Sequence, residues 1–236
     1  MTESLAKRPI GIYNMWPRNF CCDGSKPLFV ALKEDVARVA EMGFPIVYVN
    51  PFYEVGSFPK GGDKPIGSLY ASSDMRKTNP LLFGGRSEPF FDEQGKLTES
   101  GKQVRAFCDE VRKHGMVPMF DLVQSHLSPD SPYIKEANDH GLAIMKRHGN
   151  RNFVIHNRDA NYHKLNPHED SWEDVVEFDY DLADKGDSLE GRKIESHIAH
   201  NTLIPYVEQM AKLGFLAARI DSPIKTPRRV HQAVIG

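Results

Sequence analysis

The segment Gly214–Lys225 carries two side chains that could do chemistry together. It is apolar up to Arg219 and Asp221, and these two residues are expected on one face because side chains alternate along a strand. The arginine would favour the ionised form of the aspartate, which suits a carboxylate nucleophile. An ordinary ion pair at a strand end is the alternative, although buried charged pairs are costly to keep without a task.

The elements that position this pair alternate between two kinds. Short apolar runs predict strands at residues 10–16, 45–50, 116–123 and in the segment that holds Arg219 and Asp221. Apolar residues at helical spacing precede the later strands, and each stripe ends at a glycine, namely Gly43, Gly115 and Gly214. Thr98 is the predicted start of the second helix. This alternation is typical of parallel βαβ units.

Two α/β architectures fit this pattern, a doubly wound sheet and a (β/α)8 barrel of the TIM type. A doubly wound sheet that binds nucleotides needs a glycine-rich turn after an early strand, and the residues from Ile12 to Pro17 contain none. Asn50, Asp121 and Asp221 instead fall at or near predicted strand ends, where a barrel places its chemistry. We therefore predict the first four βα units of a TIM barrel.

Two long inserts interrupt the units, at residues 51–97 and 127–196. Loops of this length are usually functional or form a small subdomain. The predicted organisation is therefore barrel units in residues 1–126 with the loop 51–97, an insertion subdomain at 127–196, and a helix, the fourth strand and the start of a helix in 197–236.

Composition excludes several functions. The chain has 236 residues and a net charge of −2, with no basic tract that would suggest nucleic acid. No apolar run is long enough to span a membrane, and the N-terminus lacks the apolar core of a signal peptide. Three cysteines, an odd and sparse set, favour a reducing compartment, so we expect a cytoplasmic location.

Four segments carry a resemblance to a known family. They are Tyr70-Ala-Ser-Ser-Asp74 with Asn79-Pro80, Phe120-Asp-Leu-Val-Gln-Ser-His126, Trp172-Glu-Asp-Val175 with Phe178-Asp-Tyr180, and Arg219-Ile-Asp221 with Lys225. Together and in this order they resemble motifs of the α-amylase family of retaining glycosidases and transglycosylases. The match departs from the family at Met75, in place of a second tyrosine, and at Ser125, in place of asparagine.

A closer resemblance is to the branch that transfers maltosyl units from maltose 1-phosphate. Ser128-Pro-Asp-Ser-Pro-Tyr133 and Asp221-Ser-Pro-Ile-Lys-Thr-Pro227 are similar to phrases of that branch. His126 departs from it, because the branch has cysteine at that position.

The resemblance implies a catalytic pair and a set of substrate-binding residues. Asp221 would attack the anomeric carbon and form a glycosyl-enzyme intermediate, with Arg219 keeping it charged and oriented. The substrate-binding residues would be Tyr70 beneath a sugar ring, His126 on a sugar hydroxyl, Asp121 holding the loops, and Lys225 on the acceptor side. The expected ligand is an α-glucan or maltooligosaccharide.

No metal or cofactor is expected. His197 and His200 lie one helical turn apart, but no third ligand accompanies them. Members of the resembled family often bind calcium through an asparagine and a histidine, whose places are taken here by Ser125 and Thr226.

The resemblance also implies that a second carboxylate is missing. Retaining glycosidases need an acid/base about 5–5.5 Å from the nucleophile. The resembled family has a glutamate for this role after the fifth strand and a further aspartate after the seventh, and we expect neither in this chain. We therefore expect a partial catalytic domain that has no glycoside-cleaving activity by itself. Open strand edges would pair with the missing barrel half or with other copies of the chain. A catalytically inactive carbohydrate-binding remnant and an unrelated nucleotide-binding α/β domain are the other hypotheses.

Overall fold

The computed structural model describes residues 11–20, 26–57, 68–145, 175–180, 188–223 and 226–235. The chain divides into two compact units. Unit 1 comprises residues 1–52, 76–122 and 208–220, and unit 2 comprises residues 53–75, 123–207 and 221–236. The predicted residue Lys225 and the Trp172–Asp174 part of the third motif lie outside the described residues.

A four-stranded sheet forms the centre of unit 1. Its strands are β1 (Ile12–Met15), β2 (Ile46–Val49), β5 (Val117–Val123) and β8 (Ala217–Asp221), in the order β1-β2-β5-β8. Ile12 lies opposite Ile46 in one parallel pair, and Ile46 lies opposite Val117 in the next. Among the strands of this sheet, each neighbours the one that precedes it in sequence, as in a barrel, whereas the order reverses in a doubly wound sheet. The predicted parallel α/β sheet is confirmed.

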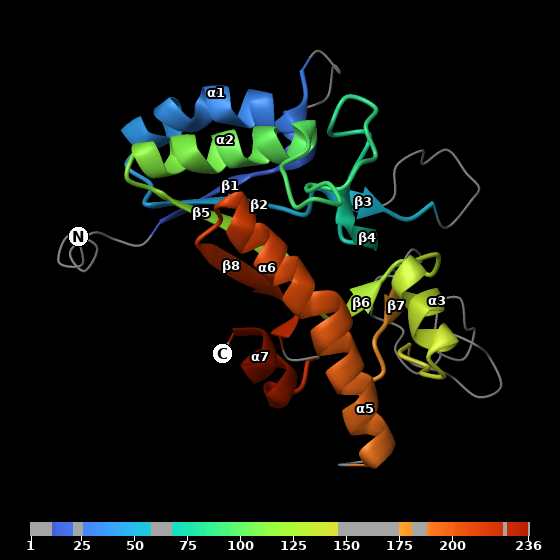
Figure 1. Cartoon of the computed structure of the whole chain (residues 1–236). Coiled ribbons are helices and arrows are strands. Elements are labelled where there is room, and N and C mark those ends of the chain that lie inside the picture. The colour runs from blue at the N-terminus through green and yellow to red at the C-terminus, as the bar shows by residue number, and fades with distance from the viewer. Residues whose placement is uncertain are drawn as a thin grey trace, which may run out of the picture. The chain divides into compact units, whose positions relative to one another are not determined.

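Two helices of unit 1 pack side by side on this sheet (Figure 1). They are α1 (Leu28–Glu41) and α2 (Glu99–Lys113), and the short 3₁₀ helix Pro17–Asn19 precedes them. The buried residues of α1 recur at helical spacing. The Thr98 side chain accepts a hydrogen bond from the Gly101 N–H and caps α2, and Gly115 follows its end with φ 74°. The predicted start of this helix at Thr98 is confirmed.

Phenylalanine rings make the core of unit 1. Phe29 meets the rings of Phe52 and Phe107 edge to face, with centroids 4.8 and 5.4 Å apart. Phe52 also stacks on Phe215, with ring centroids 5.9 Å apart, and Phe215 lies two residues before β8 begins. Each such pair adds about 0.5–1.5 kcal/mol beyond its buried area. These contacts fix the sheet whose strand ends carry the candidate site residues.

Unit 2 is built from short strands and helices. Two small sheets contain β3 (Tyr53–Val55) with β4 (Ser72–Thr78), and β6 (His126–Leu127) with β7 (Val176–Glu177). The helices are α3 (Pro132–Asp139), α5 (Leu189–Ile198), the π-helical segment Ala199–Leu203, α6 (Ile204–Leu213) and α7 (Arg228–Ile235), of which α6 continues into unit 1. Among the described residues, none of the helices is both long and apolar enough to cross a membrane.

The third predicted helix begins earlier than the sequence pattern indicates. The sequence places its apolar stripe from Leu203 onward, but α5 begins at Leu189, where the Ser188 side chain accepts from the Gly191 N–H. The predicted boundary at residue 197 therefore falls inside a helix. A buried charge hides the pattern, because Glu195 is 3% exposed and is neutralised by Arg229 of α7.

Candidate active site

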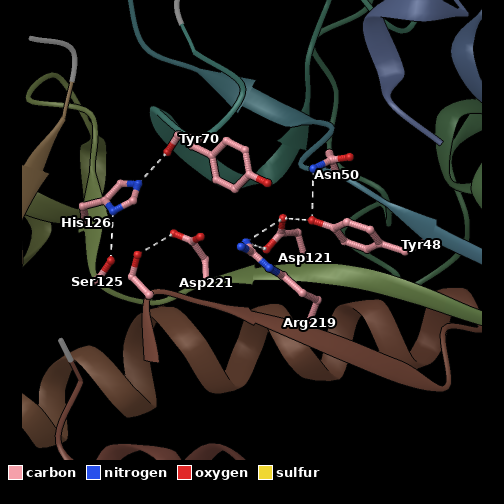
Figure 2. A network of polar contacts seen from close by, with 9 residues as sticks. Tyr48, Asn50, Tyr70, Asp121, Ser125, His126, Arg219 and Asp221 are labelled. Atoms are coloured by element: carbon pink, nitrogen blue, oxygen red, sulfur yellow. Dashed lines mark hydrogen bonds and ion pairs between the residues drawn. The ribbon is translucent and has the colours of Figure 1, made fainter. Parts of the chain in front are cut away.

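Three neighbouring strands of unit 1 meet at Asp121. Its carboxylate accepts hydrogen bonds from the Tyr48 hydroxyl of β2 and from Arg219 Nη1 of β8, the latter at 3.2 and 3.3 Å (Figure 2). Asn50 Nδ2 donates to the Tyr48 hydroxyl oxygen at 3.0 Å. The residues form a chain of donors that ends on one carboxylate, so Asp121 fixes both the tyrosine and the arginine.

The two partners of this ion pair differ in solvent exposure. The Asp121 side chain is 0% exposed, whereas the Arg219 side chain is 42% exposed. The aspartate is therefore enclosed by the protein, and the guanidinium reaches solvent from it. Sequence reasoning found Asp121 and Arg219 but missed Tyr48, because a tyrosine within an apolar strand resembles ordinary core.

Asp221 is the last residue of β8 and belongs to unit 2. It is 9% exposed, and the Ser222 hydroxyl lies 3.4 Å from its Oδ2. Ser222 has φ 47°, the only positive φ of a residue other than glycine among the described residues. A left-handed serine directly after a strand is a strained conformation of the kind that persists at functional sites.

The turn after Asp221 is held by two hydrogen bonds to one carbonyl. Pro223 O accepts from the Thr226 N–H at 3.2 Å and from His231 Nε2 of α7 at 3.1 Å. A carbonyl only accepts, so His231 Nε2 carries the proton and Nδ1 accepts from Gln124 Nε2 at 3.0 Å. The backbone oxygen of Gln124 in turn accepts from the Tyr180 hydroxyl, and burial raises the pKa of that tyrosine.

His126 and Tyr70 lie together in unit 2. His126 Nε2 is 3.1 Å from the Tyr70 carbonyl oxygen and therefore donates to it, so Nδ1 accepts from the Ser125 hydroxyl at 2.9 Å. In Figure 2 the Asp221 carboxylate projects from the strand end toward the side on which the Tyr70 and His126 rings lie. Both ring nitrogens have protein partners, so a sugar hydroxyl would have to share or replace one of them.

No metal centre accompanies these residues within the described ranges, where no three His, Cys, Asp or Glu side chains come together as a metal site requires. At the two positions named for calcium, the Ser125 hydroxyl bonds His126 and Thr226 is buried.

Comparisons with known proteins place this geometry in a known fold. No family model and no curated protein sequence matches the chain. Its structure resembles an α-amylase from Lactobacillus plantarum, with a TM-score of 0.61 at 21% identity over 94% of this chain and 42% of that one. The chain shares the fold of an α-amylase. A maltogenic α-amylase from Thermotoga neapolitana gives a TM-score of 0.60 at 18% identity, over 95% of this chain and 42% of that one.

A third α-amylase structure, from Geobacillus thermoleovorans, was determined in complex with acarbose. It matches with a TM-score of 0.56 at 12% identity, over 95% of this chain and 42% of that one. The chain therefore spans less than half the length of these α-amylases. The α-amylase fold agrees with the predicted TIM-barrel class, and none of the three names mentions maltose 1-phosphate.

Proposed function

We propose that this chain contributes the nucleophile and part of the sugar-binding surface to a retaining α-glucan-active enzyme of the α-amylase family. The observation that carries the proposal is the position of Asp221. It ends the fourth strand of a sheet with the α-amylase fold, and a left-handed serine follows it. The sheet order and the Arg219–Asp121 pair support the same assignment.

In the proposed reaction, an Asp221 oxygen attacks the anomeric carbon of the donor sugar. The glycosidic C–O bond breaks, its electron pair goes to the leaving oxygen, and that oxygen takes a proton from a general acid. Water or a sugar hydroxyl then attacks the same carbon and releases the carboxylate. We assign the general acid to none of the described residues, and we propose that a further part of the barrel or another chain supplies it.

The other predicted site residues take supporting roles. Tyr70 stacks beneath the donor ring, and His126 exchanges its bond to the Tyr70 carbonyl for one to a sugar hydroxyl as charge develops. Asp121 holds Arg219 in place, and the guanidinium provides positive charge near the strand end. Lys225 is proposed on the acceptor side.

The proposed substrate is an α-glucan or maltooligosaccharide, consistent with the acarbose bound to the Geobacillus enzyme. Maltose 1-phosphate as donor is the finer proposal, and it rests on the phrases that begin at Ser128 and Asp221. Ser128 and Ser57 both donate to Asp130, so the first phrase is tied to the segment that follows β3. We also propose a cytoplasmic location and association with the missing half or with another copy.

A carbohydrate-binding remnant without chemistry is the second candidate. The observation that favours it is that Tyr70 and His126, the two residues assigned to sugar binding, lie together, whereas we assign a general acid to none of the described residues. Covalent chemistry at Asp221 separates the two candidates, because a remnant binds sugar without forming a glycosyl adduct.

Calorimetry with maltotriose and acarbose tests the sugar-binding part of the proposal. We expect Tyr70→Ala and His126→Ala each to weaken binding about tenfold, equivalent to about 1.4 kcal/mol. His114→Ala, which removes an exposed histidine at the end of α2, is the matched control and leaves affinity unchanged. Loss of binding in the control, or unchanged binding in both site variants, contradicts the assignment. Circular dichroism of each variant excludes a folding defect.

A further inference from the structure

A groove of about 540 Å³ lies in unit 2 between α5 with its π-helical continuation and the segment that follows α3. Its lining includes Arg192, Lys193, His197 and His200 from the helix, and His140 and Leu142 from the other side. We call it the basic groove. It shares no residue with the candidate active site.

The lining of the basic groove is rich in cationic and histidine side chains. Two of its lining residues are cations and three are histidines, and none of the described residues that line it is Asp or Glu. Arg192, Lys193, His197 and His200 recur at spacings that bring them to one face of the helix. Cationic side chains gathered on one concave surface raise the local concentration of anions.

The pKa of His197 is lowered by its surroundings in the groove. Burial lowers the pKa of His197, and so does the electrostatic interaction with His140, whose ring centroid is 6.1 Å away; Glu136 of α3 acts in the opposite direction. Asn201 Nδ2 donates to His197 Nδ1 at 3.2 Å, which leaves the proton on Nε2. An anion in the groove would favour the doubly protonated ring.

The helix that carries these residues changes from α-helical to π-helical geometry beside the basic groove. Residues Ala199–Leu203 form a π-helical segment between α5 and α6. A π turn inserts an additional residue, so it rotates the side chains that follow it around the helix axis. His200 and Asn201, which line the groove, lie within this turn. Such turns are rare and occur frequently at functional sites.

We propose that the basic groove binds a phosphate group, either as inorganic phosphate or as the phosphate of a sugar ester. Arginine offers a planar fork of donors to phosphate oxygens, and lysine adds a point charge. A groove of about 540 Å³ has room for a phosphorylated monosaccharide as well as for the free ion. The site is independent of the proposed glycosidase chemistry.

Calorimetry at constant ionic strength tests this with inorganic phosphate, glucose 6-phosphate and glucose. The double variant Arg192→Gln/Lys193→Gln should weaken phosphate binding about tenfold or more, because both charge-assisted contacts are lost. The control Lys102→Gln/Lys113→Gln removes two exposed charges from α2 and should change affinity less than about twofold. Glucose 6-phosphate binding more tightly than phosphate identifies a sugar ester as the ligand, and equal affinity identifies the free ion.

Sulfate, which keeps its charge across the histidine range, tests the role of His197. Because an anion raises the pKa of His197, sulfate affinity should rise as the pH falls from 7.5 to 5.5, by about threefold to tenfold. In His197→Gln this rise should shrink. The proposal is overturned if the folded chain binds neither phosphate nor sulfate, or if both double variants lose affinity equally, which would show a general surface charge effect.

Discussion

Asp121 and Asp221 lie near the ends of neighbouring strands of one sheet, but their surroundings differ. The Asp121 side chain is fully enclosed and accepts from Tyr48 and Arg219. Asp221 ends its strand, keeps some exposure, and is followed by a left-handed serine. A fully enclosed carboxylate that holds two neighbouring side chains maintains structure, whereas strained backbone such as that after Asp221 is found most often at functional sites. Mutational effects on stability and on reactivity should therefore separate at these two residues.

The largest predicted effect on stability is at Asp121. Asp121→Asn should lower the free energy of unfolding by about 2–3 kcal/mol, because it removes the carboxylate that Arg219 and Tyr48 share. Asp221→Asn should change it by less than about 1 kcal/mol. Urea denaturation of both variants measures the difference. Equal losses of unfolding free energy would contradict the distinction between the two aspartates.

A smaller effect is predicted at Gly56 of unit 2, which packs against Ser128 and Asp130. A Cβ on Gly56 would lie 1.8 Å from Ser128 Oγ and 2.4 Å from Asp130 Oδ1. Gly56→Ala should therefore cost about 1–3 kcal/mol through overpacking. Gly85→Ala is the control, because a Cβ there meets nothing within 4 Å and only the strain of φ 84° remains, about 1 kcal/mol. Equal melting temperatures of the two variants would contradict the clash.

His231 should affect reactivity more than stability. His231→Phe removes the donor to Pro223 O, so it should cost about 1 kcal/mol of stability and slow covalent chemistry at Asp221 about tenfold. His231→Gln, which keeps a donor, should recover part of the rate. If both variants lose stability without any change in the rate of Asp221 labelling, His231 has a structural role only.

The smallest predicted effect is an acid dependence at Asp130. Burial alone raises the pKa of Asp130, but hydrogen bonds from Ser128 and Ser57 outweigh it and lower the pKa below its usual value. Its contribution to stability is therefore present above the unfolded-state pKa, near 4, and is lost as the pH falls through the lower folded-state value. Melting curves between pH 5 and pH 2 should fall less steeply for Asp130→Asn than for the natural chain.

The sequence predicts unit 1 better than unit 2 for a physical reason. The strands and helices of unit 1 bury apolar residues at regular spacing, and local caps such as Thr98 mark their ends. Strand β4, by contrast, is a polar segment, Ser72–Thr78, whose pairing depends on distant residues. In α5 the buried charge of Glu195 interrupts the apolar pattern.

The candidate site shows the same division. The alternation of side chains along a strand is enough to predict Arg219 and Asp221 as site residues. The ion pair of Arg219 with Asp121, however, joins residues 98 positions apart in the sequence. The hydrogen bond from Tyr48 spans 73 positions. Contacts of this kind depend on strand register, which a single sequence does not encode locally.

The central claim, that Asp221 is a nucleophile, can be tested without knowing which residue is the general acid. Fluoride leaves an anomeric carbon without being protonated, so a 5-fluoro-α-glucosyl fluoride needs only the nucleophile to form a slowly hydrolysed adduct. Intact-mass and peptide mass spectrometry should find one glycosyl adduct on Asp221. It should be absent in Asp221→Asn and unchanged in Asp109→Asn, which alters an exposed carboxylate of α2. No adduct on the folded chain, or an adduct that persists in Asp221→Asn, would contradict the account.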